Sequence, residues 1–427
     1  MQHIFGTFAR AMNGRRQQLR LPRQSRTFLW PALAEGVSGA VFAGAVLPFA
    51  GVLARRMGAS AEALWLLAIS PFFGYLLSFA VTRLCAYVRW GRLMALLRIL
   101  TWAPLFFLAV YGHHVSVFVV LLMLNYMVGA TSHAFFQALF REHVRERFRA
   151  GLIVVQRVVK VLFLLPIAWG VGRLLDAEPG HASLVFAVSA VFGVALALPY
   201  WPLKPRASER RGGSRPPSLA EEWRVLVSDR PFRVFMLAFF VGTLAEKIGM
   251  PILPIYFADV LDLRYEQVGL ALGVAGPLLA TGGFVFWGMQ TRRRPLFNLI
   301  LWAMILKSLR PILWAAAPLL PEPFPFVVIG EGIFRWMVAG IEMGAILAVL
   351  RFAPAHRAHL YVGIHYALLG IRGLIGPAIG WGLYRLGVPV QGILVVIAAV
   401  VLLGAFSLWR VREWVGVLAQ PPSPGPK

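Results

Sequence analysis

Long apolar runs separated by short polar segments fill most of the 427-residue chain. A helix of about 20 residues crosses a hydrocarbon layer of about 30 Å, and twelve of the runs are long enough to do so. The pattern predicts an all-α integral membrane protein. The predicted spans are 28–53, 60–82, 94–112, 115–139, 151–174, 182–203, 232–259, 266–290, 296–318, 323–350, 359–384 and 389–409.

The longest polar stretch lies between the sixth and seventh apolar runs and predicts two six-helix bundles. Ser218 and Glu221 in this stretch have the spacing of a capping box, and Leu219, Trp223 and Leu226 share one helical face. We therefore expect a short amphipathic helix on the cytoplasmic membrane surface. The predicted parts are a basic N-terminal tail (1–27), a first bundle (28–203), a linker (204–231), a second bundle (232–409) and a C-terminal tail (410–427).

The loops between the predicted spans alternate in charge. Loops on one side of the membrane are rich in lysine and arginine, and loops on the other side hold few of them. Only five lie on this second side, namely Arg55, Arg56, Arg173, Arg264 and Arg385. Cations in short loops are retained in the cytoplasm, so the alternation predicts an even number of spans with both termini inside. The other side holds 30 of the 42, in 1–27, 83–98, 140–150, 204–233, 290–295, 351–359 and after Trp409.

The composition supports a multispanning membrane protein, with 59% hydrophobic and 14% charged residues and a mean hydropathy of +0.71. In a soluble protein the net charge of +24 would suggest nucleic acid. Here the cations flank the spans, where anionic lipid explains them, and we expect no nucleic-acid partner. Cys85 is the single cysteine, which excludes an internal disulfide. The arginine-rich start has some of the composition of an organelle transit peptide, but we favour a bacterial cytoplasmic tail, which indicates the cytoplasmic (inner) membrane.

The six-plus-six layout with a long basic linker resembles the major facilitator superfamily (MFS) of transporters. Arg89, Gly91 and Arg92 match the end of the family signature G-x-x-x-D-R-x-G-R-R between spans two and three. Leu84 and Val88 stand where its first glycine and its aspartate belong. The equivalent loop between spans eight and nine also lacks an acid. The resemblance implies cytoplasmic gating loops at Arg89, Gly91, Arg92, Arg292, Arg293 and Arg294.

Ionisable residues inside the predicted spans are the candidates for a transport pathway, because a lipid-facing charge is costly. In span ten, Glu331 and Arg335 are four residues apart and are predicted to pair on one helical face. The family resemblance implies that spans one, four, seven and ten line a central cavity. The predicted substrate and proton pathway comprises Glu35, Asn125, His133, Gln137, Glu246, Glu331, Arg335, Glu342 and, in span eleven, Arg372.

Some of these residues, and two cations of span five, also have an alternative interpretation. Glu246, the residue nearest mid-membrane, is our first choice for a proton carrier, but it could instead neutralise a cation of a neighbouring span. Glu35 lies near the cytoplasmic end of its span and could reach interfacial water. Arg157 and Lys160 could snorkel to the interface. Arg372 could attract an anionic substrate or anchor a helix through backbone carbonyls.

The sequence predicts a secondary transporter that moves a small solute by alternating access, without a cofactor, metal or enzymatic activity. Buried carboxylates favour coupling to protons, and sodium coupling and facilitated exchange are the alternatives. No G-x-x-x-x-G-K-[ST] loop supports the use of ATP. We expect a monomer in a bilayer with anionic cytoplasmic lipids. One alternative is a transporter-like protein that acts as a lipid flippase, receptor or assembly partner. Another is an intramembrane transferase, for which the loops offer no paired-acid motif.

Overall fold

The computed structural model describes residues 28–84, 90–144, 146–203, 219–291, 293–354 and 357–418. The predicted tail 1–27 and the loop residues Arg89 and Arg292 lie outside the described residues, as do Cys85 and most of the linker. In the described parts all regular structure is helical, and twelve helices are long and apolar enough to cross a membrane. The predicted all-α fold with twelve spans is confirmed, and the cytoplasmic position of the termini stays a prediction.

The first half contains six spans. Span one has three pieces, because a short π-helical segment interrupts it and widens the helix where Phe42 faces the centre of the molecule. The elements are α3 (Leu29–Val41), η1 (Phe42–Val46), α4 (Leu47–Arg56), α5 (Ala61–Leu84), α6 (Trp90–Tyr111), α7 (Val115–His143), α8 (Glu146–Ala177), η3 (Pro179–His181), α9 (Ala182–Ala195) and η4 (Leu198–Tyr200).

The second half repeats this plan. A π-helical segment ends its first span, and another interrupts its second. The elements are α11 (Arg230–Ile248), α12 (Leu253–Ile255), η6 (Tyr256–Val260), α13 (Tyr265–Val268), η7 (Gly269–Ala275), α14 (Gly276–Gln290), α15 (Leu296–Lys307), α16 (Leu309–Ala316), η8 (Ala317–Leu319), α17 (Phe324–Phe352), α18 (Ala358–Arg385) and α19 (Val390–Leu418).

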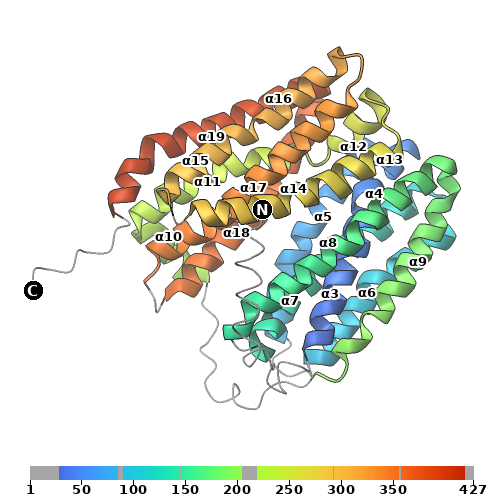
Figure 1. Cartoon of the computed structure of the whole chain (residues 1–427), viewed down its shortest axis with the longest axis horizontal. Helices are drawn as coiled ribbons and strands as arrows, with labels where there is room; N and C mark the ends of the chain where they lie inside the picture. Colours follow the sequence, from blue (N-terminus) through green and yellow to red (C-terminus); the bar gives the residue numbers. More distant parts are fainter. Residues whose placement is uncertain are drawn as a thin grey trace, which may run out of the picture.

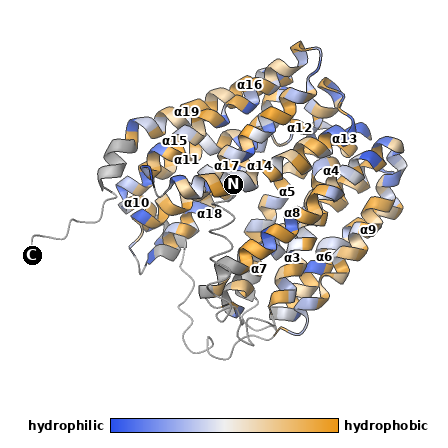
Figure 2. Ribbon diagram, viewed as in Figure 1, coloured by the Kyte–Doolittle hydropathy of each residue, from blue (hydrophilic) through white to orange (hydrophobic). Residues whose placement is uncertain are grey.

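Figure 1 shows the two halves as separate groups of helices that come together near α4, α12 and α13. Apolar residues cover the length of the spans, as Figure 2 shows. Many large apolar side chains on the outside are exposed, including Leu162, Val191 and Phe406. A soluble protein would not expose so much apolar surface, whereas acyl chains would cover it in a bilayer.

Several helices extend beyond the apolar runs that predicted them. The fourth span was expected to end at 139 and the fifth to begin at 151, yet α7 continues to His143 and α8 begins at Glu146. The twelfth span, α19, likewise continues past 409 to Leu418. Hydropathy detects only the part of a helix that lies in lipid, whereas the backbone hydrogen bonds continue into the polar segment.

The predicted linker helix is present as α10 (Leu219–Ser228). It packs against α11 and α18 of the second half, with Val225 buried in that half's core. Asp229 follows it and caps α11 by accepting a hydrogen bond from the Phe232 amide at 3.0 Å. Asp229 also accepts a hydrogen bond from the Tyr361 hydroxyl at 2.7 Å. The position of α10 on a membrane surface stays a prediction.

The two halves are joined by polar contacts at the ends of the spans opposite the basic loops. We call this end the closed face. The Asp176 carboxylate accepts hydrogen bonds from the backbone amides of Tyr265 and Glu266, both at 2.7 Å, and so caps the start of the eighth span. Arg55 pairs with Asp259 at 2.5 Å. By the predicted topology, the closed face is the outer one.

Apolar side chains also join the two halves at the closed face. The rings of Trp65 and Trp381 stack with centroids 5.0 Å apart. A Cβ added to Gly51 would lie 2.6 Å from the Pro254 side chain, so only glycine allows the first spans of the two halves to approach this closely.

Candidate functional site

A central cavity with a volume of about 810 Å³ lies between the two halves. This volume is in the range of sites that hold small molecules, about 300 to 1,000 Å³. Residues of spans one to five line it from the first half, and residues of spans seven to ten line it from the second. Its charged and imidazole-bearing lining residues are Glu35, Arg98, His133, Arg157, Lys160, Glu246, Lys247, Arg310 and Arg335.

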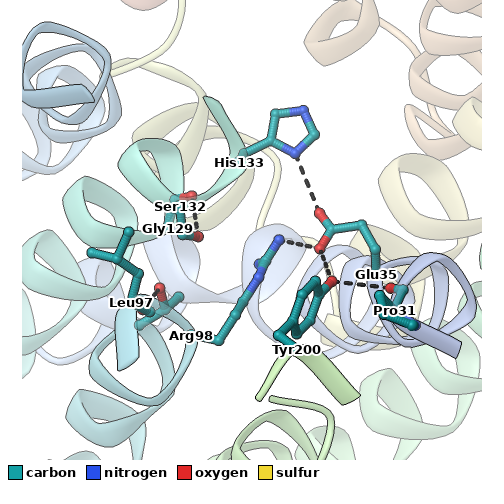
Figure 3. A network of polar contacts seen from close by, with 9 residues as sticks. Pro31, Glu35, Leu97, Arg98, Gly129, Ser132, His133 and Tyr200 are labelled. Carbon is teal, nitrogen blue, oxygen red and sulfur yellow. Dashed lines mark hydrogen bonds and ion pairs between the residues drawn. The ribbon is translucent and has the colours of Figure 1, made fainter. Parts of the chain in front are cut away.

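Glu35 is the centre of a polar network inside the first half (Figure 3). Its carboxylate forms an ion pair with Arg98 of α6. The Tyr200 hydroxyl lies 3.1 Å from Glu35 Oε2 and 3.0 Å from the Pro31 carbonyl oxygen. His133 Nδ1 lies 3.3 Å from Glu35 Oε1. Glu35 is 7% exposed, so this network satisfies a carboxylate that would otherwise be costly to bury.

The position of Arg98 differs from the sequence prediction, which placed it among the cations of the cytoplasmic loops. It lies inside α6 and is 7% exposed. A single cation at the cytoplasmic end of an apolar run looks the same in the sequence whether it points to water or to the protein interior. The signal that could have identified it is Glu35, a carboxylate at a similar depth in span one.

A second network lies inside the second half, around the fully buried Glu331. Arg335 Nε donates to Glu331 Oε1 at 2.6 Å, which is the pair expected from their spacing. Arg310 Nη1 donates to the other oxygen at 3.1 Å. The Arg310 guanidinium also lies 3.4 Å from the centre of the Phe334 ring. One carboxylate therefore holds two guanidinium groups in place.

Glu246 lines the cavity and pairs with the adjacent Lys247 at 3.0 Å. The Lys247 ammonium also faces the ring of Phe72, from span two of the other half, at 5.7 Å. Behind this pair, the buried Lys307 donates to the Gly242 carbonyl oxygen at 3.2 Å. Both predicted roles of Glu246, proton carrier and neutralising partner, stay open in this arrangement.

Arg157 and Lys160 of α8 line the same cavity. In the part of the chain that the structure describes, neither side chain has an ion pair or a hydrogen bond. Snorkelling to the interface is one interpretation of both residues from the sequence, and in the structure both line the central cavity.

Among the described side chains, Glu331 and three other predicted pathway residues do not line the cavity. Asn125 is fully buried between spans, and its Nδ2 donates to the Thr101 carbonyl oxygen at 2.7 Å. Glu342 is exposed on α17. Arg372 is buried with its guanidinium 5.5 Å from the Phe239 ring centre. The side chain of Gln137 lies outside what the structure describes. Their functional roles stay predictions.

The described residues of the predicted gating loops lie at the surface or against the first half. Gly91 lies so close to η4 that an added Cβ would be 2.5 Å from the Tyr200 carbonyl oxygen. The Arg92 guanidinium is 5.7 Å from the Trp201 ring centre. Arg293 and Arg294 are exposed. A gating role for these loops stays a prediction.

Comparison with known proteins gives matches at the level of structure. No family model matches the chain, and no curated protein matches its sequence. A crystal structure of a mutant of the nucleoside transporter NupG is 10% identical, with a TM-score of 0.72 over 90% of this chain and 99% of that one. A peptide-bound POT family transporter is 13% identical, with a TM-score of 0.70 over 93% and 97%. A bacterial homologue of the lysosomal transporter Spinster is 14% identical, with a TM-score of 0.65 over 94% and 100%.

Proposed function

We propose that this chain, which has the fold of the major facilitator superfamily, is a secondary transporter that moves a small solute across a membrane by alternating access. The observation that carries the proposal is the central cavity, whose walls come from both halves while the halves are joined at the closed face. A site between two rigid halves can face each side of the membrane in turn as the halves rock. The likeness to transporters such as NupG supports this proposal through the shared fold.

The polar networks explain how each half can rock as a rigid body. Glu35 and Arg98 lie in spans one and three of the first half, and Glu331 and Arg310 lie in spans ten and nine of the second. Each network lies within a single half, so a rocking motion of the two halves breaks neither network. The contacts that must break are at the closed face, where Asp176 and Arg55 reach across to the other half.

Proton coupling is part of the proposal, with two carboxylates as carriers to be tested. Glu246 lines the cavity but is held by Lys247. Glu342 has no ion pair with the described residues, although Glu246 repels it and Arg157, Lys247 and Arg335 attract it electrostatically. A proton can bind to Glu342 without breaking an ion pair, whereas protonating Glu246 would release a cation.

Counterflow in proteoliposomes tests the proposal. Purified protein is reconstituted, the vesicles are loaded with unlabelled solute, and entry of the labelled solute is followed with and without an inward proton gradient. We expect at least one solute of a chemically varied panel to show transient accumulation above equilibrium. A receptor or assembly partner would show none for any solute. Movement of labelled lipid between leaflets without solute counterflow would favour the flippase alternative.

A further inference from the structure

The central cavity carries more positive charge than its own carboxylates neutralise. Six cationic side chains line it, and its two carboxylates, Glu35 and Glu246, are each already paired with one of them. Glu331, behind the wall, is shared between two of the others. The six cations are Arg98, Arg157, Lys160, Lys247, Arg310 and Arg335. An excess of cations in a partly desolvated site attracts a diffusible anion.

Lys160 of α8 is the clearest unsatisfied cation on the first-half wall. It is half-buried, and its stem lies over α3, where a Cβ added to Gly39 would be 3.6 Å from its Cδ and Cε atoms. Its ammonium group has neither an ion pair nor a hydrogen bond within the described residues. Burying a charge is costly without a partner, so a ligand that supplies one would bind here favourably.

Arg335 of α17 supplies matching donors from the second half. Its Nε donates a hydrogen bond to Glu331. Within the described chain, its two Nη groups have no hydrogen-bond partner. The Arg335 side chain is 42% exposed to the cavity region, so these groups can be reached. Lys160 is repelled by Arg157 and attracted by Glu35, which is already paired with Arg98. Lys160 and Arg335, which line the cavity from different halves, also repel each other. An anion between them would turn this repulsion between the halves into attraction to both.

An aromatic wall adjoins these cations. Phe42 of span one packs edge-on against Tyr126 of span four, with ring centroids 5.6 Å apart, and against Trp102 of span three, at 6.5 Å. All three residues line the cavity. Such a surface would bury the apolar body of a ligand whose acidic group faces the cations.

We infer that the cavity binds a small organic anion, with its carboxylate or phosphate group held between Lys160 and Arg335 and its apolar body against Phe42, Trp102 and Tyr126. This inference rests on the proposed transport function and names the class of its substrate. Because each half contributes one cation, the anion binds more tightly when the cavity narrows and both halves contact the same charged group.

Matched ligand pairs that differ in charge test the inference. Benzoate is compared with neutral benzamide, and phenyl phosphate with neutral benzyl alcohol, by equilibrium binding to the purified full-length protein in detergent. We expect at least one anion to bind and its neutral partner not to. Lys160→Gln should weaken that binding about tenfold or more, the loss expected for a charge-assisted hydrogen bond. Lys160→Arg should retain it.

The control is Arg173→Gln, which removes a cation of the same helix that lies outside the cavity, over the Trp169 ring. It should leave anion affinity unchanged. The inference is overturned if neither anion binds better than its neutral partner, if Lys160→Gln and Arg173→Gln weaken binding equally, or if phosphatidylglycerol binds and both soluble anions fail. Counterflow of neutral solutes with no preference for anions would overturn this inference alone, and absence of any counterflow would overturn the proposed function.

Discussion

The Arg98 guanidinium and the Glu35 carboxylate form an ion pair sealed inside the first half, with both side chains less than a tenth exposed. The third spans of the two halves share this feature, because Arg310 in span nine also pairs with a buried carboxylate, Glu331. In each half, a guanidinium from the third span ties two helices together through a carboxylate. These pairs fix the walls of the cavity.

Replacing Arg98 by glutamine should strongly destabilise the protein, because it leaves the Glu35 carboxylate buried without its cation. We expect the free energy of unfolding in detergent to fall by about 3 to 5 kcal/mol. The double variant Glu35→Gln/Arg98→Gln should recover part of this loss, since no charge remains buried. Arg92→Gln, at an exposed position of the same helix, should cost less than about 1 kcal/mol. Additive effects of the two single substitutions would contradict a direct ion pair.

Replacing Asp176 by alanine should open the closed face, because it removes two charge-assisted hydrogen bonds between the halves. Labelling with a membrane-impermeant maleimide measures this opening, with Cys85→Ser as background and Leu47→Cys in the cavity lining as reporter. We expect the labelling rate from the outside to rise roughly tenfold or more. Asp262→Asn provides the control, since this side chain is 91% exposed and makes a 3.5 Å contact with Arg56. Asparagine also tolerates the positive φ of 43° at this position. Equal labelling of both variants would argue against a latch at Asp176.

Alanine at Gly193 should destabilise the first half. An added Cβ there would lie 1.9 Å from the Trp102 ring, and the ring itself is buried and has little room to shift. Overpacking of this kind costs about 1 to 3 kcal/mol. Gly170→Ala, where no heavy atom lies within 4 Å of the added Cβ, should instead be neutral or stabilise the helix by up to about 1 kcal/mol. Melting temperatures in detergent compare the two, and a loss at Gly170 as large as that at Gly193 would refute the packing argument.

Proton coupling can be assigned by comparing Glu246→Gln with Glu342→Gln. The sequence pattern favours Glu246, but in the structure Lys247 holds that carboxylate and Glu342 has no ion pair in the described chain. We therefore expect Glu342→Gln to abolish most of the acceleration by an inward proton gradient while counterflow without a gradient persists. Glu246→Gln should instead lower stability, since it leaves Lys247 unpaired. An unchanged gradient response in both variants would exclude these carboxylates as carriers.

The sequence predicted features that depend on neighbouring residues along one helix. The pair of Glu331 and Arg335 was predictable because residues four apart lie on the same face of any α-helix. The addition of Arg310 to this pair was not predictable, since it depends on how spans nine and ten pack. Lys160 illustrates the same limit. Its place in a span could be predicted, but its direction, toward the cavity rather than toward the interface, required the neighbouring helices.

By itself, the sequence determined the number of spans, the two six-span halves and the fold they form, because burying backbone in lipid requires apolar runs of fixed length. Only the tertiary structure decided which ionisable side chains meet. Glu35 and Arg98 come from different spans, and Lys160 and Arg335 come from different halves. Helix packing brings such residues together, and the pattern of apolar and polar positions along one span carries no information about its neighbours.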